Sequence, residues 1–568
     1  MIEFDRVGAR YASDGPAVLS DVTMTVPEGE LCLVVGPTGA GKSTLLATVN
    51  GRMPHFTGGE LTGRVRVDGR DTRTHPPREL ADAVGVVGQN PWAGFVTDTV
   101  SDELAYTMES LGVPPAVMRR RVEDIIDALG LAELRERPLR TLSSGQAQRV
   151  AIGAVLTAAP RVLVLDEPTS ALDPGAAEEV LALLQRLVHD LGLTLLLAEH
   201  RLERVIHYAD SVVRVEPGRA IRRETPAVAM LDSDIAPAVV QLGRVAGWEP
   251  LPLSVRDARR RAPELRRRLP LDRPAHASRL DAATAAATGR SPRRTVAWLE
   301  DVTVRYDATV ALAGVRLDFA AGDITTVMGR NGAGKSTLLN ALTGLARPTR
   351  GRVRLAAPVD GNDAADGGVT PFASGPGATA EPHRLNAREL IRRVGLVPQQ
   401  PADLFFADSV AAECAEADGS AGVERGTAAQ VLTEITGTVD PATHPRDLSE
   451  GQQLSLALAL VLVGRAGLVL LDEPTRGLDY PAKVRLGRVL RRLAARGCGV
   501  VVATHDVELA AAISRRTIVM ADAEVVADGP TSAVVTSSPA FAPQVAKVLA
   551  PLPYLTVDDV RLGLVAAS

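Results

Sequence analysis

A glycine-rich stretch near the N-terminus combines residue types that can hold a phosphate group. Its residues are Gly36, Pro37, Thr38, Gly39, Ala40, Gly41, Lys42, Ser43 and Thr44. The glycines allow backbone N–H groups to surround phosphate oxygens at the positive end of a helix. Lys42 can reach the β- and γ-phosphates of a nucleotide, and the Ser43 hydroxyl can bind Mg²⁺. A glycine turn can arise by chance, but the apolar strand before this one and the helix after it favour a P-loop.

The same stretch occurs a second time in the chain. Its residues are Gly329, Arg330, Asn331, Gly332, Ala333, Gly334, Lys335, Ser336 and Thr337. Repetition at a fixed period, here about 290 residues, indicates two copies of one structural unit. We therefore expect two nucleotide-binding modules in one chain, with Ser336 as the second Mg²⁺ ligand of this type.

Two adjacent carboxylates follow an apolar strand in each copy. They are Asp166 and Glu167 in the first copy, and Asp472 and Glu473 in the second. Such a pair suits phosphoryl transfer, because the aspartate can order the water shell of Mg²⁺ while the glutamate polarises the attacking water. We predict that the aspartates serve the metal and that the glutamates are catalytic.

A glutamine and a histidine also recur in register at strand ends. Gln89 and Gln399 follow short apolar runs, and each amide can contact Mg²⁺ or the attacking water. His200 and His505 end a later apolar run in each copy. A single glutamine in a turn would mean little, and a lone histidine at a strand end is usually structural. Their recurrence in both copies favours a role near the γ-phosphate.

A Leu-Ser-x-Gly-Gln sequence opens a helix in each copy. Its serine and first glycine are Ser143 and Gly145 in the first copy, and Ser449 and Gly451 in the second. A serine and a glycine at a helix N-terminus can bind a second phosphate face. On its own, such a sequence is more often a simple helix N-cap.

An aromatic residue ends the first expected hairpin strand of each copy, Tyr11 and Tyr306. Either ring could stack on adenine, because every base offers a π-face. The alternative is a strand aromatic that packs in the core.

Composition excludes several other classes of protein. The chain has 568 residues, 46% of them apolar, and a net charge of −5, which gives no support to nucleic-acid binding. Its three cysteines are far apart and lack histidine partners, so neither disulfides nor a zinc site is expected. The strand pattern at Ile2–Val7 leads us to expect no signal peptide, and the longest apolar run, Leu454–Gly464, is too short to span a bilayer. If the protein works at a membrane, a partner must supply the span.

The repeat also sets the expected domain boundaries. The expected segments are a first ATPase domain at 1–235, its helical tail at 236–270, a linker at 271–294, a second ATPase domain at 295–535 and its helical tail at 536–568. A Gly/Ala/Pro-rich insert, Ala357–Glu381, is predicted to be a disordered surface loop. Arginine runs at Arg259–Arg261 and Arg266–Arg268 either contact lipid headgroups or a partner, or form a solvated helix face.

In this order, the complete set of motifs resembles the ATP-binding-cassette ATPases over nearly the whole chain. The resemblance implies an α/β fold with two P-loop NTPase domains. Each domain would have an antiparallel β subdomain, a RecA-like core, a helical subdomain and a small helical C-terminal tail.

The resemblance also implies that two ATP molecules, each with Mg²⁺, lie between the modules in a head-to-tail pair. Lys42, Gln89, Glu167 and His200 would then face Ser449 and Gly451, and Lys335, Gln399, Glu473 and His505 would face Ser143 and Gly145. Ser144 and Glu450 replace the commoner second glycine of the signature.

A narrower resemblance is to the ATPase component of energy-coupling factor importers, which take up vitamins or transition metals. It rests on Val87–Glu103 and Val397–Glu413, where the glutamine runs into a Pro-x-x-x-Phe segment and ends at a glutamate. Gly94 and Leu404 stand where that group usually has a second glutamine. The resemblance implies an integral membrane coupling protein, a substrate-binding membrane receptor, no nucleic acid, and a peripheral position on the cytoplasmic face of the cell membrane.

Two other twin-cassette functions remain alternatives. A ribosome-acting ATPase would carry a long charged helical linker, which the prolines at 250, 252, 263, 270 and 274 disfavour here. A DNA-repair cassette would need zinc-binding cysteines, which the chain does not provide. A fused sugar-importer ATPase often has one degenerate site, whereas both sites here keep the glutamate and the histidine.

Overall fold

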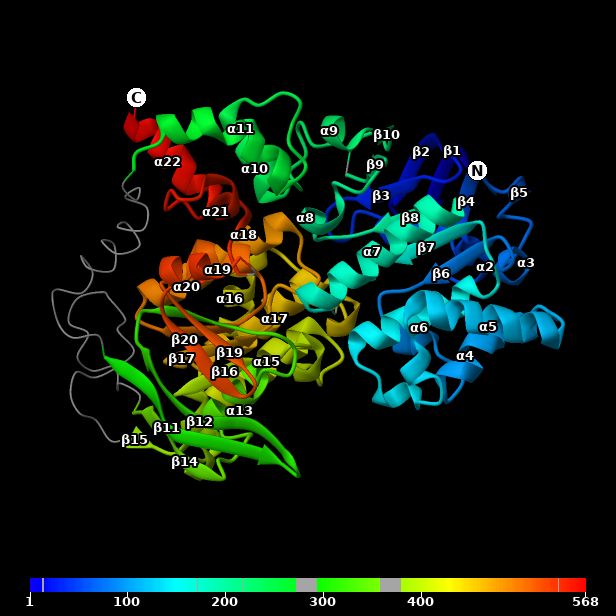
Figure 1. The fold of residues 1–568 in the computed structure, drawn as a ribbon. Coiled ribbons are helices and arrows are strands. Elements are labelled where there is room, and N and C mark those ends of the chain that lie inside the picture. The colour runs from blue at the N-terminus through cyan, green and yellow to red at the C-terminus, as the bar shows by residue number, and fades with distance from the viewer. Residues whose placement is uncertain are drawn as a thin grey trace. The chain divides into compact units, whose positions relative to one another are not determined.

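The computed structural model describes residues 1–12, 15–170, 172–216, 218–271, 294–357, 379–539 and 541–567 (Figure 1). The chain divides into two compact units. The first comprises Met1–Val240 and Glu249–Ser254, and the second comprises Gln241–Trp248 and Val255–Ser568. Each unit is described by itself below.

The first unit begins with a small antiparallel sheet in the order β2-β1-β4-β5. Its strands are β1 (Ile2–Arg10), β2 (Leu19–Val26), β4 (Glu60–Val67) and β5 (Arg70–Asp71). Burial alternates along β2, as expected where one face of a strand meets the core and the other meets solvent. Ile2 and Phe4 of β1 share a hydrophobic core with Val34 and Val164 of the larger sheet, so the two sheets pack on each other.

The larger sheet of the first unit has six strands in the order β10-β9-β3-β8-β7-β6. They are β3 (Leu31–Val35), β6 (Val84–Val87), β7 (Val162–Asp166), β8 (Thr194–Ala198), β9 (Ser211–Arg214) and β10 (Arg223–Glu224). All neighbours are parallel except β10, which pairs antiparallel with β9. Parallel strands buried on both faces read as continuous apolar runs, which explains the five buried residues of β3 and of β8. The carboxyl ends of β3, β6, β7 and β8 lie at one edge, where α/β folds bind ligands.

The helices of the first unit fall into two groups. Two follow strands of the large sheet, α1 (Lys42–Val49) after β3 and α7 (Pro174–Leu191) after β7. Three others, α4 (Val100–Ser110), α5 (Pro115–Leu129) and α6 (Ser144–Leu156), pack on one another as a helical subdomain. The short helices are α2 (Arg52–His55), α3 (Pro77–Leu80), α8 (Leu202–Val205) and α9 (Pro226–Ala229).

The second unit repeats this plan. Its antiparallel sheet has the order β12-β11-β14-β15, and its six-stranded sheet has the order β16-β17-β18-β13-β19-β20. The strands are β11 (Thr295–Tyr306), β12 (Thr309–Ala320), β13 (Ile324–Met328), β14 (Arg350–Ala356), β15 (Thr379–Ala380), β16 (Val394–Val397), β17 (Leu468–Asp472), β18 (Gly499–Ala503), β19 (Arg516–Ala521) and β20 (Glu524–Pro530). The helices are α13 (Lys335–Thr343), α14 (Ala387–Ile391), α15 (Val410–Ala421), α16 (Thr427–Thr436), α17 (Glu450–Val463), α18 (Tyr480–Ala495), α19 (Val507–Ile513) and α20 (Thr531–Ser537). The predicted α/β fold with two P-loop domains is therefore confirmed.

The expected extent of one loop needs correction. The predicted loop 357–381 ends in regular structure, because β15 pairs with β14 through Leu355–Ala380 and Ala356–Thr379; residues 358–378 lie outside the described residues. The helical tail predicted at 236–270 includes α11 (Val255–Arg268), and Pro263 lies inside this helix. The helix tolerates this proline and runs for 14 residues. Most of the predicted linker, 272–293, lies outside the described residues.

The predicted helical tails exist, and α11 of the first one belongs to the second compact unit. The first tail contains α10 (Ala238–Ala246) and α11, while the C-terminal tail contains α21 (Gln544–Leu549) and α22 (Val557–Ala567). Figure 1 shows the green α11 beside the red α21, and the Arg266 guanidinium donates a hydrogen bond to the Val548 carbonyl. Tyr554 Oη donates to the Pro270 carbonyl at 3.2 Å. The domain boundaries at 235, 270, 294 and 535 stay predictions.

Two further expectations concern the arginine run of α11 and the buried cysteine of β3. Arg259 and Arg260 are exposed on α11, whereas Arg261 is half-buried. Cys32 is buried among core residues, and burial raises the pKa of its thiol to about 12, so it is an unreactive core residue. Among the described helices, none is long and apolar enough to cross a bilayer.

Candidate active site

The two P-loops have the same geometry. Lys42 is buried, and its Nζ donates to the carbonyls of Gly36 at 2.9 Å and Pro37 at 3.1 Å. Lys335 donates in the same way to Gly329 at 2.9 Å and Arg330 at 3.2 Å. These bonds hold each ammonium group inside the loop, where it can exchange its carbonyl partners for phosphate oxygens.

Glycine is required at two places in each loop. Gly41 and Gly334 precede α1 and α13 with φ values of 102° and 100°, a left-handed conformation that favours glycine. A side chain at Gly36 would meet the Val215 carbonyl oxygen at 2.1 Å. Neither helix has a side-chain N-cap, so the first backbone N–H groups point to the loop and can bind an anion.

The aspartate at the end of β7 and of β17 meets the P-loop serine. Burial raises the pKa of Asp166, and a hydrogen bond with Ser43 opposes that rise. Burial raises the pKa of Asp472 in the same way, with Ser336 as its partner. In each aspartate, Oδ1 is buried without a hydrogen-bond partner among the described residues. A hydroxyl beside an unsatisfied carboxylate oxygen fits the water shell of Mg²⁺, whose preferred ligands are oxygens.

In the first unit, the structure brings together the three residues predicted to act on water. His200 Nε2 lies 2.7 Å from Glu167 Oε1, and Gln89 Nε2 donates to Glu167 Oε2 at 3.1 Å. These side chains come from the ends of β8, β7 and β6, which are neighbours in the sheet. The glutamate is 9% exposed, so its carboxylate is held where a water on a bound phosphate can be polarised.

In the second unit, the glutamate has different partners. His505 Nδ1 lies 2.7 Å from Glu473 Oε2, and Lys335 Nζ lies 3.6 Å from Glu473 Oε1. Gln399 is exposed in the loop after β16, as Gln89 is after β6, but among the described residues it has no hydrogen bond to Glu473. The same motif therefore produces two different hydrogen-bond arrangements around the glutamate.

Both glutamates have an unusual backbone conformation that the sequence did not predict. Glu167 has a φ of 52° and Glu473 a φ of 48°, in the left-handed region that non-glycine residues seldom adopt. Their N–H groups donate to the carbonyls of Ala198 at 2.9 Å and Ala503 at 2.8 Å. Strain of this kind persists only where surrounding contacts fix it, and it is common at active sites.

The predicted adenine-contacting tyrosines are not core residues. Tyr11 is 49% exposed and Tyr306 is 50% exposed. Tyr11 Oη lies 3.0 Å from Thr44 Oγ1, which connects this tyrosine to the P-loop. The core alternative is therefore excluded, while stacking on adenine stays a prediction.

The signature residues cap helices within their own units. Ser143 caps α6, where Gln146 N donates to Ser143 Oγ at 3.3 Å and Ser143 N donates to Gln146 Oε1 at 2.9 Å. Ser449 and Gln452 make the same reciprocal bonds at the start of α17. Gly145 and Gly451 lie in the first turns of these helices. Both serines are therefore helix N-caps. Contact of these residues with phosphate stays a prediction.

Two buried glutamates organise the segments that follow the glutamine loops. Glu103 Oε2 accepts from the backbone N–H groups of Val96 at 3.0 Å and Thr97 at 2.9 Å. Glu413 Oε1 accepts from Phe406 and Ala407 in the same manner. The recurrence of a glutamate 14 residues after each glutamine was the sequence signal for this arrangement.

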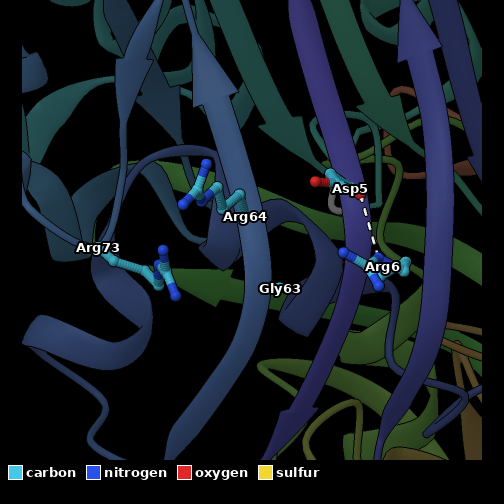
Figure 2. A pocket seen from close by; sticks show the side chains of 5 residues that line it. All are labelled: Asp5, Arg6, Gly63, Arg64 and Arg73. Carbon is cyan, nitrogen blue, oxygen red and sulfur yellow. Dashed lines mark ion pairs between the residues drawn. The ribbon is translucent and has the colours of Figure 1, made fainter.

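A shallow hollow on the small antiparallel sheet of the first unit is separate from this site. Figure 2 shows its lining, Asp5, Arg6, Gly63, Arg64 and Arg73. Arg6 pairs with Asp5 at 3.5 Å, and Arg73 pairs with Asp71 at 3.2 Å. No predicted site residue lines the hollow.

Comparison with known proteins identifies the repeated unit. The family model described as ABC transporter matches residues 19–170 and 312–476. A protein of Streptomyces avermitilis, named as an ABC transporter ATP-binding protein, is 57% identical over 99% of this chain and 100% of its own length.

Two solved structures also resemble the chain. The archaeal ribosome recycling factor aABCE1, solved with the ribosomal stalk protein aP1, superposes with a TM-score of 0.57 at 19% identity, over 94% of this chain and 91% of that one. The cbiO1 structure from Clostridium perfringens, described as part of the transporter complex cbiONQ, has 28% identity and covers 46% of this chain and 96% of its own. Its TM-score is 0.39.

Proposed function

Because this chain belongs to the ABC transporter family and contains two ATPase modules, we propose that it is the ATP-hydrolysing subunit of an energy-coupling factor type importer. A separate integral membrane protein would couple hydrolysis to transport, and a membrane receptor would bind the vitamin or transition metal. The chain would lie on the cytoplasmic face of the membrane. The narrower assignment rests on the resemblance of Val87–Glu103 and Val397–Glu413 to that group.

Exposed apolar side chains after the two glutamine loops are the main support for this proposal. Val96 is 61% exposed and Phe406 is 84% exposed, and they occupy corresponding positions. Both belong to the backbone segments that Glu103 and Glu413 hold. An apolar residue fixed on the surface at equivalent places in both modules is suited to a protein partner rather than to solvent.

The proposed hydrolysis follows from the geometry of each module. The P-loop N–H groups and Lys42 bind the phosphates, Asp166 and Ser43 would hold Mg²⁺, and Glu167 orients and polarises the attacking water. His200 fixes the Glu167 carboxylate. Bound Mg²⁺ neutralises charge that develops on the phosphate oxygens. In the head-to-tail pair, Ser449 and Gly451 would complete the first site, and Ser143 and Gly145 the second.

ATP binding then favours a closed pair of modules, and hydrolysis favours an open one. Short segments connect each glutamine to an exposed apolar residue. Residues 90–95 connect Gln89 to Val96, and residues 400–405 connect Gln399 to Phe406. They would pass the movement to the membrane partner, as a ligand-biased switch between two states.

A ribosome-acting ATPase is the alternative. Its support is the fold-level likeness to aABCE1, and at 19% identity that likeness concerns the fold alone. A fused sugar-importer ATPase is the other alternative, and the intact glutamate and histidine in both modules disfavour it.

Purification from the native host in mild detergent tests the proposal. We expect a polytopic membrane protein to accompany the wild-type chain and to be lost from the double variant Val96→Asp/Phe406→Asp. Leu345→Asp, at another residue that is 74% exposed, is the matched control and should keep the partner. ATP binding in the same preparations separates loss of a partner from unfolding. Ribosomal proteins in place of a membrane protein would overturn the transport proposal.

A further inference from the structure

The residue before the active-site histidine differs between the modules. It is Glu199 in the first and Thr504 in the second, and both are buried, at 3% and 0% exposure. A buried carboxylic acid is costly unless hydrogen bonds compensate it. Because the second module forms the same strand end with a threonine, the fold itself does not require an acid here.

The acid has a specific partner in the first module. Thr169 N donates to Glu199 Oε1 at 3.0 Å, and Thr169 is itself buried. Thr169 lies two residues after Glu167 in the turn that leaves β7. Glu199 therefore connects the end of β8, which carries His200, to the turn that carries Glu167.

The second module lacks this connection to the backbone of the turn. Thr475 Oγ1 and Thr504 Oγ1 lie 3.5 Å apart, and Thr504 Oγ1 accepts from Asp506 N at 3.0 Å within its own loop. A buried ion pair secures this loop instead, with Lys483 Nζ 2.7 Å from Asp506 Oδ2. Ala177 and Arg201 occupy the corresponding positions in the first module.

The surroundings of Glu199 agree with a role as hydrogen-bond acceptor. Burial raises its pKa, and the hydrogen bonds from Thr169 oppose the rise. The Glu167 carboxylate raises the pKa further, and the Arg204 guanidinium lowers it. Whether neutral or charged, the side chain keeps an oxygen that can accept the Thr169 N–H, and the amide of glutamine offers the same acceptor.

We propose that Glu199 is a positioning residue for hydrolysis at the first ATP site, where it holds the Thr169 N–H and so fixes Glu167 against His200. Glu167 has a left-handed backbone, with a φ of 52°, which persists only where surrounding contacts fix it, and the Thr169 bond is one contact close to it. The inference goes beyond the proposed transport function. It rests on the ATPase activity and on the assignment of Glu167 as the glutamate of the first site, and it does not depend on any membrane partner.

Single-turnover hydrolysis by the full chain tests this role. The parent is the Glu473→Gln variant, with protein in excess over Mg-ATP, so that hydrolysis reports the first site. We expect Glu199→Thr to lower the rate constant about tenfold, since small misplacements of a catalytic group are costly. The ATP concentration for half-saturation should change less than about twofold, because ATP binding is not affected.

Glu199→Gln provides the rescue that separates positioning from charge. It should retain the parent rate within about twofold, because it keeps the acceptor oxygen. Glu179→Thr, the same change at an exposed glutamate of α7, is the matched control and should leave the rate unchanged. A normal rate in Glu199→Thr, or an equal loss in Glu199→Thr and Glu199→Gln, would overturn the inference.

Two further controls keep the result interpretable. If the Glu473→Gln parent hydrolyses no faster than Glu167→Gln/Glu473→Gln, the first site has no independent hydrolysis and the inference is overturned. If that double variant itself keeps wild-type turnover, the assignment of Glu167 fails instead, and the inference fails with it. Failure of the transport proposal would appear only in the purification experiment.

Discussion

The two hydrolytic centres share the lysine, serine, glutamine, aspartate, glutamate and histidine of their motifs but differ in how their glutamates are held. Glu167 bonds to His200 through Nε2 and to Gln89, whereas Glu473 bonds to His505 through Nδ1 and lies 3.6 Å from Lys335. The strand orders of the two sheets are the same. Matching site residues on the same topology therefore do not guarantee the same hydrogen bonds around the glutamate.

The loops that carry His200 and His505 also have different stabilising contacts. The first module uses the Glu199–Thr169 bond, and the second uses the Lys483–Asp506 ion pair. The loop at the histidine is thus held by different chemistry in the two modules. The following predictions test how far these differences extend to function and stability.

The largest effect is expected when both glutamates are removed. Glu167→Gln/Glu473→Gln should lower steady-state ATP turnover about a thousandfold, because general-base assistance contributes on this scale. Nucleotide binding, measured by equilibrium dialysis, should remain. The two single variants then compare the sites directly. Unchanged turnover in the double variant would show that the glutamates have no catalytic role.

Breaking the ion pair of the second module should cost stability. Lys483→Ala leaves Asp506 buried without its ammonium partner, at a cost of about 2 kcal/mol. Because the stability of one module is local, hydrogen exchange of Val507–Ile513 in α19 is the suitable measurement. Arg485→Ala, at an exposed residue of the same helix α18, is the control. Equal exchange in both variants would contradict the importance of this pair.

The two glutamines should contribute unequally. Gln89→Ala removes a hydrogen bond to Glu167, so we expect about a tenfold loss at the first site, measured in the Glu473→Gln parent. Both glutamines are exposed, but among the described residues only Gln89 bonds to its glutamate, so Gln399→Ala in the Glu167→Gln parent should have the smaller effect. A larger loss from Gln399→Ala would mean that ATP binding rearranges the second site.

The smallest effect concerns pH and Glu199. Its pKa is raised in the folded protein by burial, so the native state binds this proton more tightly than the unfolded state does. The stabilisation is present at low pH and is lost as pH rises from the usual glutamate range through the folded pKa. Glu199→Gln, which has no such proton, should therefore gain stability relative to wild type as pH rises. Urea unfolding of both proteins at two pH values measures this, and a difference independent of pH would contradict it.

The sequence by itself determined the repeat, the fold class and the grouping of the site residues. Apolar runs followed by Gly36, Gln89, Glu167 and His200 indicated strand ends, and parallel strands place their carboxyl ends at one edge. Periodicity and turn residues are local properties, so they could be read without coordinates.

Only the tertiary structure decided the contacts that depend on neighbours distant in sequence. The left-handed Glu167, the histidine nitrogen that meets each glutamate, the Glu199–Thr169 bond and the packing of α11 on α21 all belong to this class. Each depends on which side chains converge on a position and on the rotamers that their packing allows. Local pattern carries no information on either, which is why two nearly identical sets of motifs produced two differently held glutamates.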